Sequence, residues 1–279
     1  MSSRLLLPEG IIACLFDLDG VLTRTAELHA AAWKQTFDAF LRSRSLAGGE
    51  TFVPFDAEAD YYAYVDGKLR SDGVRSFLAA RGIELPEGSP VEPSSVDTVY
   101  SLGHAKNELV RELMSQRGVA TYEGSVRLLH AVRESGLRTA VVTSSENATV
   151  VLRAAGLDGA FDAQVDGIVA RELNLAGKPA PDVFLEGARR LGVAPSHAAM
   201  FEDALAGVAA GRAGNFGLVV GVDRKVQAAE LRAAGADVVV ADLGELLARA
   251  DTSKDATKAD GDAVDKRTRA SDLMEGFLQ

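Results

Sequence analysis

Two carboxylates one residue apart, Asp17 and Asp19, directly follow an apolar run from Ile11 to Phe16. Such a run is long enough for a buried strand. Because side chains alternate between the two faces of a strand, Asp17 and Asp19 are expected on the same side. Ligands of open α/β sheets bind at the carboxyl ends of strands. A carboxylate pair there can bind a divalent metal ion, or divide into a nucleophile and an acid/base. The alternative is an ordinary Asp-Gly turn after a strand.

Hydroxyl groups and a lysine follow later in the chain. The apolar run 137–143 ends in Thr143, Ser144 and Ser145, whose hydroxyls can donate hydrogen bonds to a phosphate. Their alternative role is to cap the next helix. Lys178 lies in a Gly-Lys-Pro-Ala-Pro-Asp segment, where two prolines stiffen the chain and hold the lysine in place. The alternative is a lysine in a solvated loop.

A second acidic pair, Glu202 and Asp203, follows the apolar run 198–201. Adjacent acids at a strand end can supply oxygen ligands to a metal ion. Their alternative role is an acidic first turn of a helix, which favours the helix dipole. Each of these segments is ambiguous alone, but four of them in order, each at the end of a predicted strand, indicate one phosphate and metal site.

The elements that must position these residues alternate along most of the chain. Strands are predicted over 11–16, 137–143, 161–165, 197–201, 216–222 and 236–240, and helices over 147–155, 181–191 and 205–214. Strands that alternate with helices of about ten residues predict βαβ units and a parallel sheet. The fold class is therefore α/β, with a Rossmann-like parallel core.

A helical block interrupts this pattern directly after the first strand. Residues 28–117 show helical apolar faces, such as that of Trp33, Phe37, Phe40 and Leu41, and no convincing alternating strand. An inserted helical domain beside the carboxyl edge of a sheet is well placed to act as a lid. We predict a core of residues 1–25 and 120–250, a helical cap of residues 26–119, and a polar, disordered tail over 251–279.

Composition narrows the classes of function. The chain has 279 residues, a net charge of −10 and no basic block, which argues against nucleic acid or an anionic membrane as a partner. The first turn is Asp-Leu-Asp-Gly, so it lacks the glycine-rich turn that cradles a pyrophosphate, and no Walker-type Gly-Lys-Ser/Thr occurs. A single cysteine, Cys14, and the lack of a signal peptide or an apolar run of about 20 residues predict a cytoplasmic protein.

Together, the four segments resemble the motifs of the haloacid dehalogenase superfamily of phosphotransferases, over roughly residues 11–247. Asp17-Leu-Asp-Gly-Val-Leu-Thr matches the first motif, Thr143 the second, Lys178 the third and Glu202-Asp203 the fourth. The resemblance implies that Asp17 is the nucleophile and Asp19 the acid/base. It also implies Mg²⁺ bound by Asp17, the backbone carbonyl of Asp19 and Asp203, with Glu202 close by. Lys178 and Thr143 would then bind the phosphoryl oxygens.

The helical insertion resembles that of the β-phosphoglucomutase-like subfamily. Residues 65–72 look like its substrate loop, with Arg70 as the grip on a distal phosphate, and Lys106-Asn107 looks like a pair that contacts the sugar. The resemblance also places His29, Ser144, Ser145 and Asn147 among the residues that bind substrate.

The subfamily interconverts β-glucose 1-phosphate and glucose 6-phosphate through an aspartyl phosphate, with β-glucose 1,6-bisphosphate as primer and intermediate. The expected partner is therefore a small sugar phosphate, and the expected state a monomer. An alternative is a sugar-phosphate phosphatase of the same fold. A third possibility, a catalytically inactive binding protein, is disfavoured because every motif residue is present. Two residues depart from the pattern: Arg24 stands where many relatives carry an acid, and Glu146 where they often carry a lysine or another polar residue.

Overall fold

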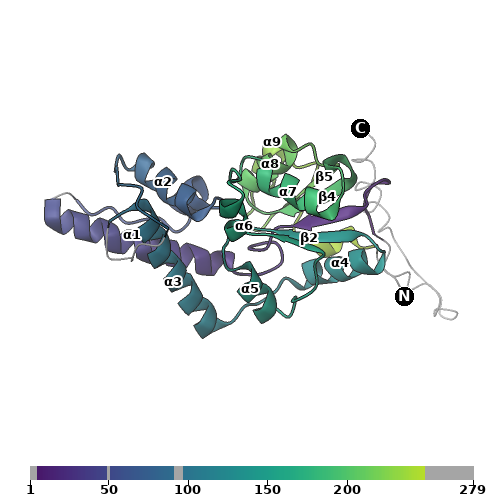
Figure 1. Cartoon of the computed structure of the whole chain (residues 1–279), viewed down its shortest axis with the longest axis horizontal. Coiled ribbons are helices and arrows are strands. Elements are labelled where there is room, and N and C mark those ends of the chain that lie inside the picture. Colours follow the sequence, from purple (N-terminus) through teal and green to yellow (C-terminus); the bar gives the residue numbers. More distant parts are fainter. Residues whose placement is uncertain (1–4, 49–50, 91–96, 249–279) are drawn as a thin grey trace, which may run out of the picture.

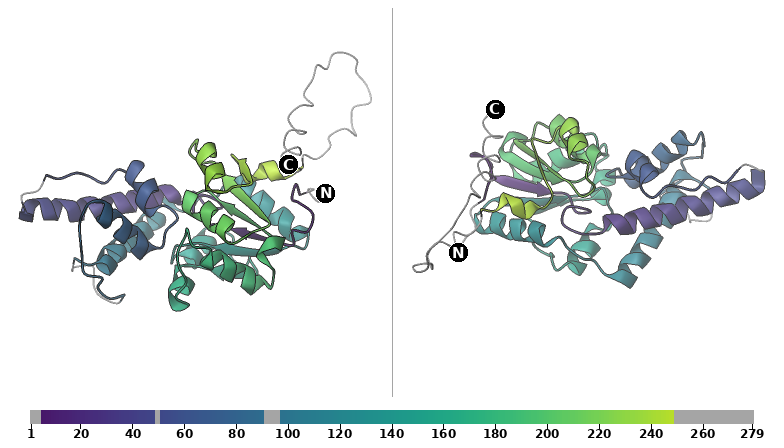
Figure 2. Two further views of the ribbon diagram at one scale, coloured as in Figure 1. Left: turned by 90° about the horizontal axis from the view of Figure 1, so that it is seen from above. Right: turned by 180° about the vertical axis from the view of Figure 1, so that it is seen from behind.

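The computed structural model describes residues 5–48, 51–90 and 97–248. The chain forms a sheet-containing core and an elongated helical part beside it, which Figure 1 shows on the right and on the left. Two further views show the same division (Figure 2). The predicted tail, residues 251–279, lies outside the described residues. No described helix is both long and apolar enough to cross a membrane.

The core contains six parallel strands in the order β3-β2-β1-β4-β5-β6. Their bounds are β1 Ala13–Phe16, β2 Arg138–Val142, β3 Ala163–Val165, β4 Ala198–Glu202, β5 Leu218–Val222 and β6 Val238–Val240. This order confirms the predicted Rossmann-like fold, although most strands are shorter than the apolar runs. The order reverses beside β1, and such a switch point leaves a crevice at the carboxyl ends of the strands.

Helices cover both faces of the sheet. Alternate residues of β1 point to opposite sides: Cys14 and Phe16 belong to one apolar cluster, and Ala13 and Leu15 to the other. The first cluster includes side chains of α4 (Glu123–Glu134), α5 (Ala148–Ala154) and the short 3-10 helix η3 (Leu243–Leu246). The second includes side chains of α6 (Gly167–Glu172), α7 (Asp182–Leu191), α8 (Leu205–Ala213) and α9 (Ala228–Ala234). In Figure 1, α4 and α5 lie below β2, and α8 and α9 lie above it. A 3-10 turn, η2 (Pro195–His197), leads into β4.

The described part of the inserted block contains helices and irregular segments but no strand, as predicted. It contains α1 (Ala26–Gly48), the π-helix η1 (Tyr61–Val65), α2 (Arg70–Ala80) and α3 (Val99–Arg117). It has a core of its own, built on stacked and tilted aromatic rings of Trp33, Phe37, Phe55 and Phe77. Its helices α1 and α3 also contribute buried residues to the first cluster of the sheet, namely Leu28, Ala32, Val110, Leu113 and Met114, so the cap packs on the core as well as within itself.

The two chain crossings between cap and core lie side by side. The backbone N–H of Arg24 donates to the carbonyl of Ala120 at 2.8 Å, and Thr23 forms a β-bridge with Thr121. The guanidinium of Arg24 lies over the ring of Tyr122, 4.4 Å from its centre. Arg24 therefore belongs to the hinge. The predicted boundaries at 25/26 and 119/120 fall beside these crossings, and the domain division itself stays a prediction.

Candidate active site

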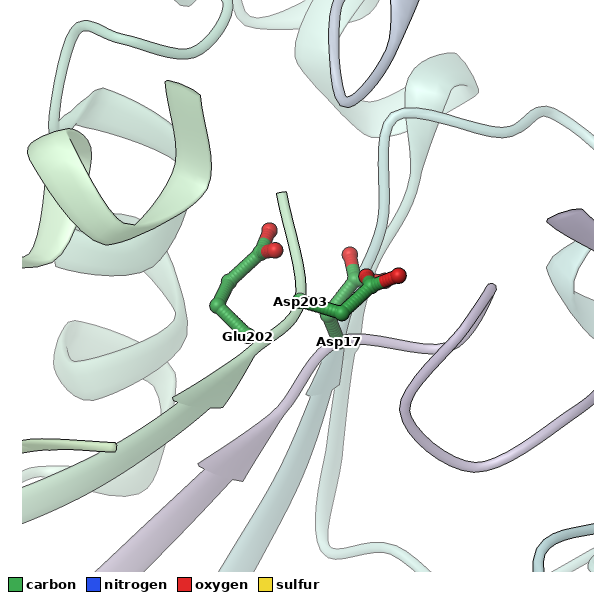
Figure 3. Close-up of side chains that lie close together, drawn as sticks. All are labelled: Asp17, Glu202 and Asp203. Carbon is green, nitrogen blue, oxygen red and sulfur yellow. The ribbon is translucent and has the colours of Figure 1, made fainter. Parts of the chain in front are cut away.

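Three carboxylates meet at the carboxyl ends of the two central strands (Figure 3). Asp17 follows β1, Glu202 ends β4, and Asp203 comes next. The parallel register pairs Phe16 with Phe201, so the residues that follow must emerge together. One ligand atom from each carboxylate lies within 4.8 Å of the others, and all three side chains are buried. A group of carboxylates at this separation is a candidate metal centre.

Lys178 reaches this group from the loop between α6 and α7, so the prediction that it follows a strand is wrong. Its Nζ donates to Oδ1 of Asp17 at 2.6 Å and also to Oε1 of Glu202, and it lies 4.9 Å from the ring centre of Phe184. Burial lowers the pKa of Lys178, but the two carboxylates outweigh burial and raise the pKa above its usual value. Lys178 is therefore a fixed charge beside Asp17, rather than the solvated loop lysine of the alternative interpretation.

The local charge balance favours a divalent cation. Three carboxylates surround one ammonium group, that of Lys178, which pairs with Asp17 and Glu202, so two negative charges are in surplus when all three acids are ionised. Burial, together with the other acids, raises the pKa of Asp17 and of Asp203 well above the usual range, because an isolated buried carboxylate is costly. An oxygen-only ligand set with two surplus negative charges matches the preference of hard divalent ions such as Mg²⁺. The residues present therefore fit a metal ion of this class.

Two glycines make room for the acids. A Cβ on Gly20 would overlap the carboxylate of Asp203, and a Cβ on Gly207 would overlap that of Glu202. Gly20 also has a φ of +88°, a left-handed conformation that glycine adopts readily. Gly207 lies in the first turn of α8, which begins only at Leu205. The acidic pair thus precedes the helix, and the alternative of an acidic first helical turn is wrong.

Asp19 faces the cavity apart from the three carboxylates. Oδ1 accepts a short hydrogen bond from the hydroxyl of Thr25 and lies 3.5 Å from Nε2 of His29. Oδ2 accepts from the hydroxyl of Thr143 at 3.4 Å. These contacts hold the carboxylate of Asp19 in the cavity, close enough to Asp17 for the two charges to interact. Its predicted contribution to the metal, the backbone carbonyl, stays a prediction.

A lysine and a histidine of the cap lie above Asp19. The Nζ of Lys106 lies 2.9 Å from Nδ1 of His29 and 5.0 Å from the ring centre of Trp33. Burial lowers the pKa of Lys106 to about 7; the charge of Arg70 acts in the same direction, while those of Asp19 and Glu146 oppose it. Burial and the adjacent Lys106 lower the pKa of His29 to about 4. Because the pKa of Lys106 lies near neutral pH, an anion that binds beside it raises this pKa and favours the charged form of the lysine.

The hydroxyl segment after β2 lies between the core and the cap. Ser144 donates to the carbonyl of Gly67 in the cap at 2.7 Å, and Asn147 donates from Nδ2 to Oδ1 of Asn107 at 2.8 Å. The N-cap of α5 is Asn147, whose side chain makes no capping bond. The N-cap position itself is therefore not a hydroxyl residue. Ser145 nevertheless accepts from the backbone N–H of Asn147 at 3.2 Å, and Thr143 from that of Ser145 at 3.1 Å, so two of the hydroxyls support the turn that leads into the helix.

Two ion pairs between cap and core were not expected from the sequence. Arg70 donates to Oε2 of Glu146 at 2.7 Å, and Lys225, in the loop after β5, donates to Oδ2 of Asp66 at 3.1 Å. Arg70, the predicted ligand of a distal phosphate, therefore pairs with a carboxylate of the protein itself. The strand-end rule that singled out the other motifs also applies to the loop after β5, and could have drawn attention to Lys225.

All of the residues that the sequence analysis selected for the site line one cavity between cap and core. They are Asp17, Asp19, His29, Arg70, Lys106, Thr143, Ser144, Ser145, Asn147, Lys178, Glu202 and Asp203. Acids and the lysine that binds them occupy the end of the cavity formed by the sheet. Basic groups of the cap face it. An anion that carries two charged ends would match this distribution.

Comparison with known families agrees with this geometry. Residues 11–215 match the family model described as haloacid dehalogenase-like hydrolase. The chain belongs to this family. It is 58% identical over 249 residues to a β-phosphoglucomutase of Mycobacterium bovis, with 88% of this chain and 95% of the relative covered. It is 31% identical over 236 residues to a β-phosphoglucomutase of Bacillus subtilis, with 84% and 91% covered.

A solved structure extends the similarity to the fold. The crystal structure of β-phosphoglucomutase from Clostridium difficile matches with a TM-score of 0.66 and 25% identity, over 85% of this chain and 93% of that one. The similarity spans both the sheet and the helical insertion. It therefore confirms the predicted family and its helical insertion, and the chain is that of an enzyme similar to β-phosphoglucomutases.

Proposed function

We propose that the protein is a β-phosphoglucomutase that interconverts β-glucose 1-phosphate and glucose 6-phosphate. The observation that carries the proposal is the pair of opposed sites in one cavity: Asp17 with Lys178 at the sheet, and Arg70 in the cap. A mutase needs both, since it transfers one phosphate while it holds another. The identity of 58% to a β-phosphoglucomutase over most of the chain supports the same assignment.

We infer that Mg²⁺ is the resident metal, held by Asp17, Asp203 and the backbone carbonyl of Asp19, with Glu202 close by. When bound, the ion offsets the negative charges of the carboxylates and of the incoming phosphate. Glu202 contributes mainly through Lys178, whose ammonium group it shares with Asp17.

The phosphoryl transfer uses Asp17 as nucleophile. A carboxylate oxygen of Asp17 forms a bond to phosphorus, and the bond from phosphorus to the sugar oxygen breaks, which leaves an aspartyl phosphate. Lys178 and the hydroxyl of Thr143 bind the phosphoryl oxygens, over which charge spreads in the transition state. Asp19 gives a proton to the departing sugar oxygen and takes one from the hydroxyl that attacks next.

The cap presents the sugar and its second phosphate. Arg70 binds the distal phosphate, while Lys106, His29 and Asn147 contact the substrate. The intermediate, β-glucose 1,6-bisphosphate, turns over between the two transfers so that either phosphate can face Asp17. Exclusion of water by the cap keeps the aspartyl phosphate for the sugar. The monomeric state and the cytoplasmic location remain predictions.

A second candidate is a sugar-phosphate phosphatase, since the matching family model is described as a hydrolase. In that case water would attack the aspartyl phosphate. The two functions differ in their need for a grip on a second phosphate.

Arg70→Ala tests this difference. Loss of a charge-assisted contact of about 2–3 kcal/mol should slow isomerisation of β-glucose 1-phosphate by about 10²-fold. Hydrolysis of a small aryl phosphate, which has no second phosphate, should lose far less. Arg75→Ala is the matched control, because Arg75 lies in the same helix but pairs with Glu87 and Asp72 outside the cavity. An unchanged rate of isomerisation in Arg70→Ala would favour the phosphatase.

A further inference from the structure

Glu146 lies between two guanidinium groups at the rim of the active-site cavity. Oε2 accepts from Arg70 of the cap at 2.7 Å, and Oε1 accepts a short hydrogen bond from Arg171 of α6. The two arginines thus hold one carboxylate from two sides, one from the cap and one from the core. The side chain of Glu146 is 21% exposed, so solvent and ligands can reach it.

The position of Arg171 is fixed by its helix. The side chain of Asp166 accepts from the backbone N–H groups of Ile168 and Val169, at 3.0 and 2.9 Å, and so caps the start of α6. A Cβ on Gly167 would lie 2.7 Å from the carbonyl oxygen of Ser144 and 3.0 Å from Cγ of Glu146, so this end of α6 packs tightly on the segment after β2. Arg171 follows Gly167 by four residues and lies on the same face of the helix, directed at Glu146.

The charges around Glu146 do not balance. Two guanidinium groups face one carboxylate, which leaves one positive charge in excess. A phosphate dianion in the same place would balance both and would offer three oxygens instead of two. Guanidinium groups bind phosphate and carboxylate with similar geometry, through paired N–H donors. The arrangement is therefore better matched to phosphate than to the group that occupies it.

We propose that the carboxylate of Glu146 takes the place of the distal phosphate in the ligand-free enzyme, and that Arg171 binds this phosphate together with Arg70 once Glu146 is displaced. The inference rests on the proposed mutase function and adds to it a second distal-phosphate ligand and an internal competitor. The Glu146–Arg70 pair also links the core to the cap before substrate arrives.

A second cavity can receive the side chain of Glu146 when phosphate displaces it. This cavity adjoins the first and shares Arg70, Ser144 and Glu146 with it. Its walls include Arg75 and Arg171 as well as Tyr100 and Asn174, so a carboxylate that turns into it meets cationic and polar groups. Phosphate binding then requires only a side-chain rotation of Glu146, since like charges repel it from the incoming dianion.

Competition from Glu146 predicts opposite effects of two substitutions. The quantity to measure is the KM for β-glucose 1-phosphate, at a saturating concentration of β-glucose 1,6-bisphosphate and of Mg²⁺. Glu146→Gln keeps the size of the side chain but removes its charge, so KM should fall about tenfold, equivalent to about 1.4 kcal/mol. Arg171→Ala should raise KM about tenfold, with kcat reduced much less, and Arg171→Lys should recover part of the loss.

Controls separate binding from folding. Arg171 is 44% exposed, so its replacement should leave the melting temperature nearly unchanged. Arg153→Ala, an exposed arginine in the last turn of α5 that does not line the cavity, should leave KM at the wild-type value.

Two results would overturn the inference while leaving the mutase function in place. One is a KM within twofold of wild type in Arg171→Ala, and the other is a KM that rises in Glu146→Gln, which would make Glu146 a ligand of the sugar or a support for Arg70. A wild-type enzyme that fails to isomerise β-glucose 1-phosphate would instead overturn the proposed function, and the inference with it.

Discussion

Replacement of Lys178 by methionine removes the ammonium group that two buried carboxylates share. The side chains of Lys178, Asp17 and Glu202 are 1%, 7% and 1% exposed. Removal of one partner from a buried ion pair costs about 3–5 kcal/mol, because the remaining charge is left uncompensated. At about 2–4 °C per kcal/mol for a protein of this size, the melting temperature should fall by roughly 6–20 °C.

The loss should depend on pH in a defined direction. The positive charge of Lys178 lowers the pKa of Asp17. When that charge is removed, the pKa of this buried carboxyl rises further above its value in the unfolded chain. A carboxyl with a raised pKa in the folded state stays neutral at low pH and destabilises the fold as pH rises through that pKa. The variant should therefore lose more stability at pH 8 than at pH 5.

The assay is thermal unfolding followed by circular dichroism in EDTA, at both pH values. Lys34→Met is the matched control: Lys34 also pairs with an aspartate, Asp38, at 2.9 Å, but its side chain is 42% exposed. An exposed pair of this kind contributes at most about 1 kcal/mol. Added Mg²⁺ should restore part of the stability of Lys178→Met, since a cation compensates the same charges. If Lys178→Met lost no more stability than Lys34→Met, the account of the buried charges would be refuted.

The two remaining predictions concern the metal site and the cap. Gly20→Ala should weaken Mg²⁺ binding at least tenfold in calorimetry, because the new Cβ displaces the carboxylate of Asp203. The control is Gly156→Ala: Gly156 has a φ of +70°, and a Cβ there would have no atom within 4 Å. This variant should therefore share the backbone strain but keep the affinity for Mg²⁺. An equal affinity in both variants would contradict this. The pKa of Lys106 is about 10.4 in the unfolded chain, and burial lowers it to about 7 in the folded protein. Between these two pH values the unfolded state therefore binds more protons than the folded state. The free energy of unfolding should therefore rise by up to about 1.4 kcal/mol per pH unit above pH 7 relative to Lys106→Met, and parallel pH profiles would disprove it.

The sequence predicted the sheet and the residues at its edge because both depend on local patterns. Apolar runs mark the strands, and parallel strands present their carboxyl ends at one edge, so Asp17 and Asp203 could be brought together without coordinates. The same rule misplaced Lys178, which follows a helix instead of a strand. The predicted ends of the strands were less accurate than their order. Ile12 belongs to the first apolar run but lies outside β1 and is 53% exposed.

The contacts between cap and core could not be predicted in the same way. Arg70 and Glu146 are 76 residues apart, and Lys225 and Asp66 are 159 apart, so the pairs depend on the angle at which the helical insertion meets the sheet. The spacing of residues along the sequence gives no information about that angle. For the same reason, the departure of Glu146 from the family pattern was visible, while its pairing with Arg70 was not.

The central claim is that phosphate leaves Asp17 for a sugar rather than for water. The direct measurement follows glucose 6-phosphate and inorganic phosphate together, with wild-type enzyme, β-glucose 1-phosphate and Mg²⁺. We expect a lag that added β-glucose 1,6-bisphosphate removes, because Asp17 starts without phosphate, and we expect glucose 6-phosphate to form in large excess over inorganic phosphate. Release of inorganic phosphate as fast as glucose 6-phosphate forms would contradict the account.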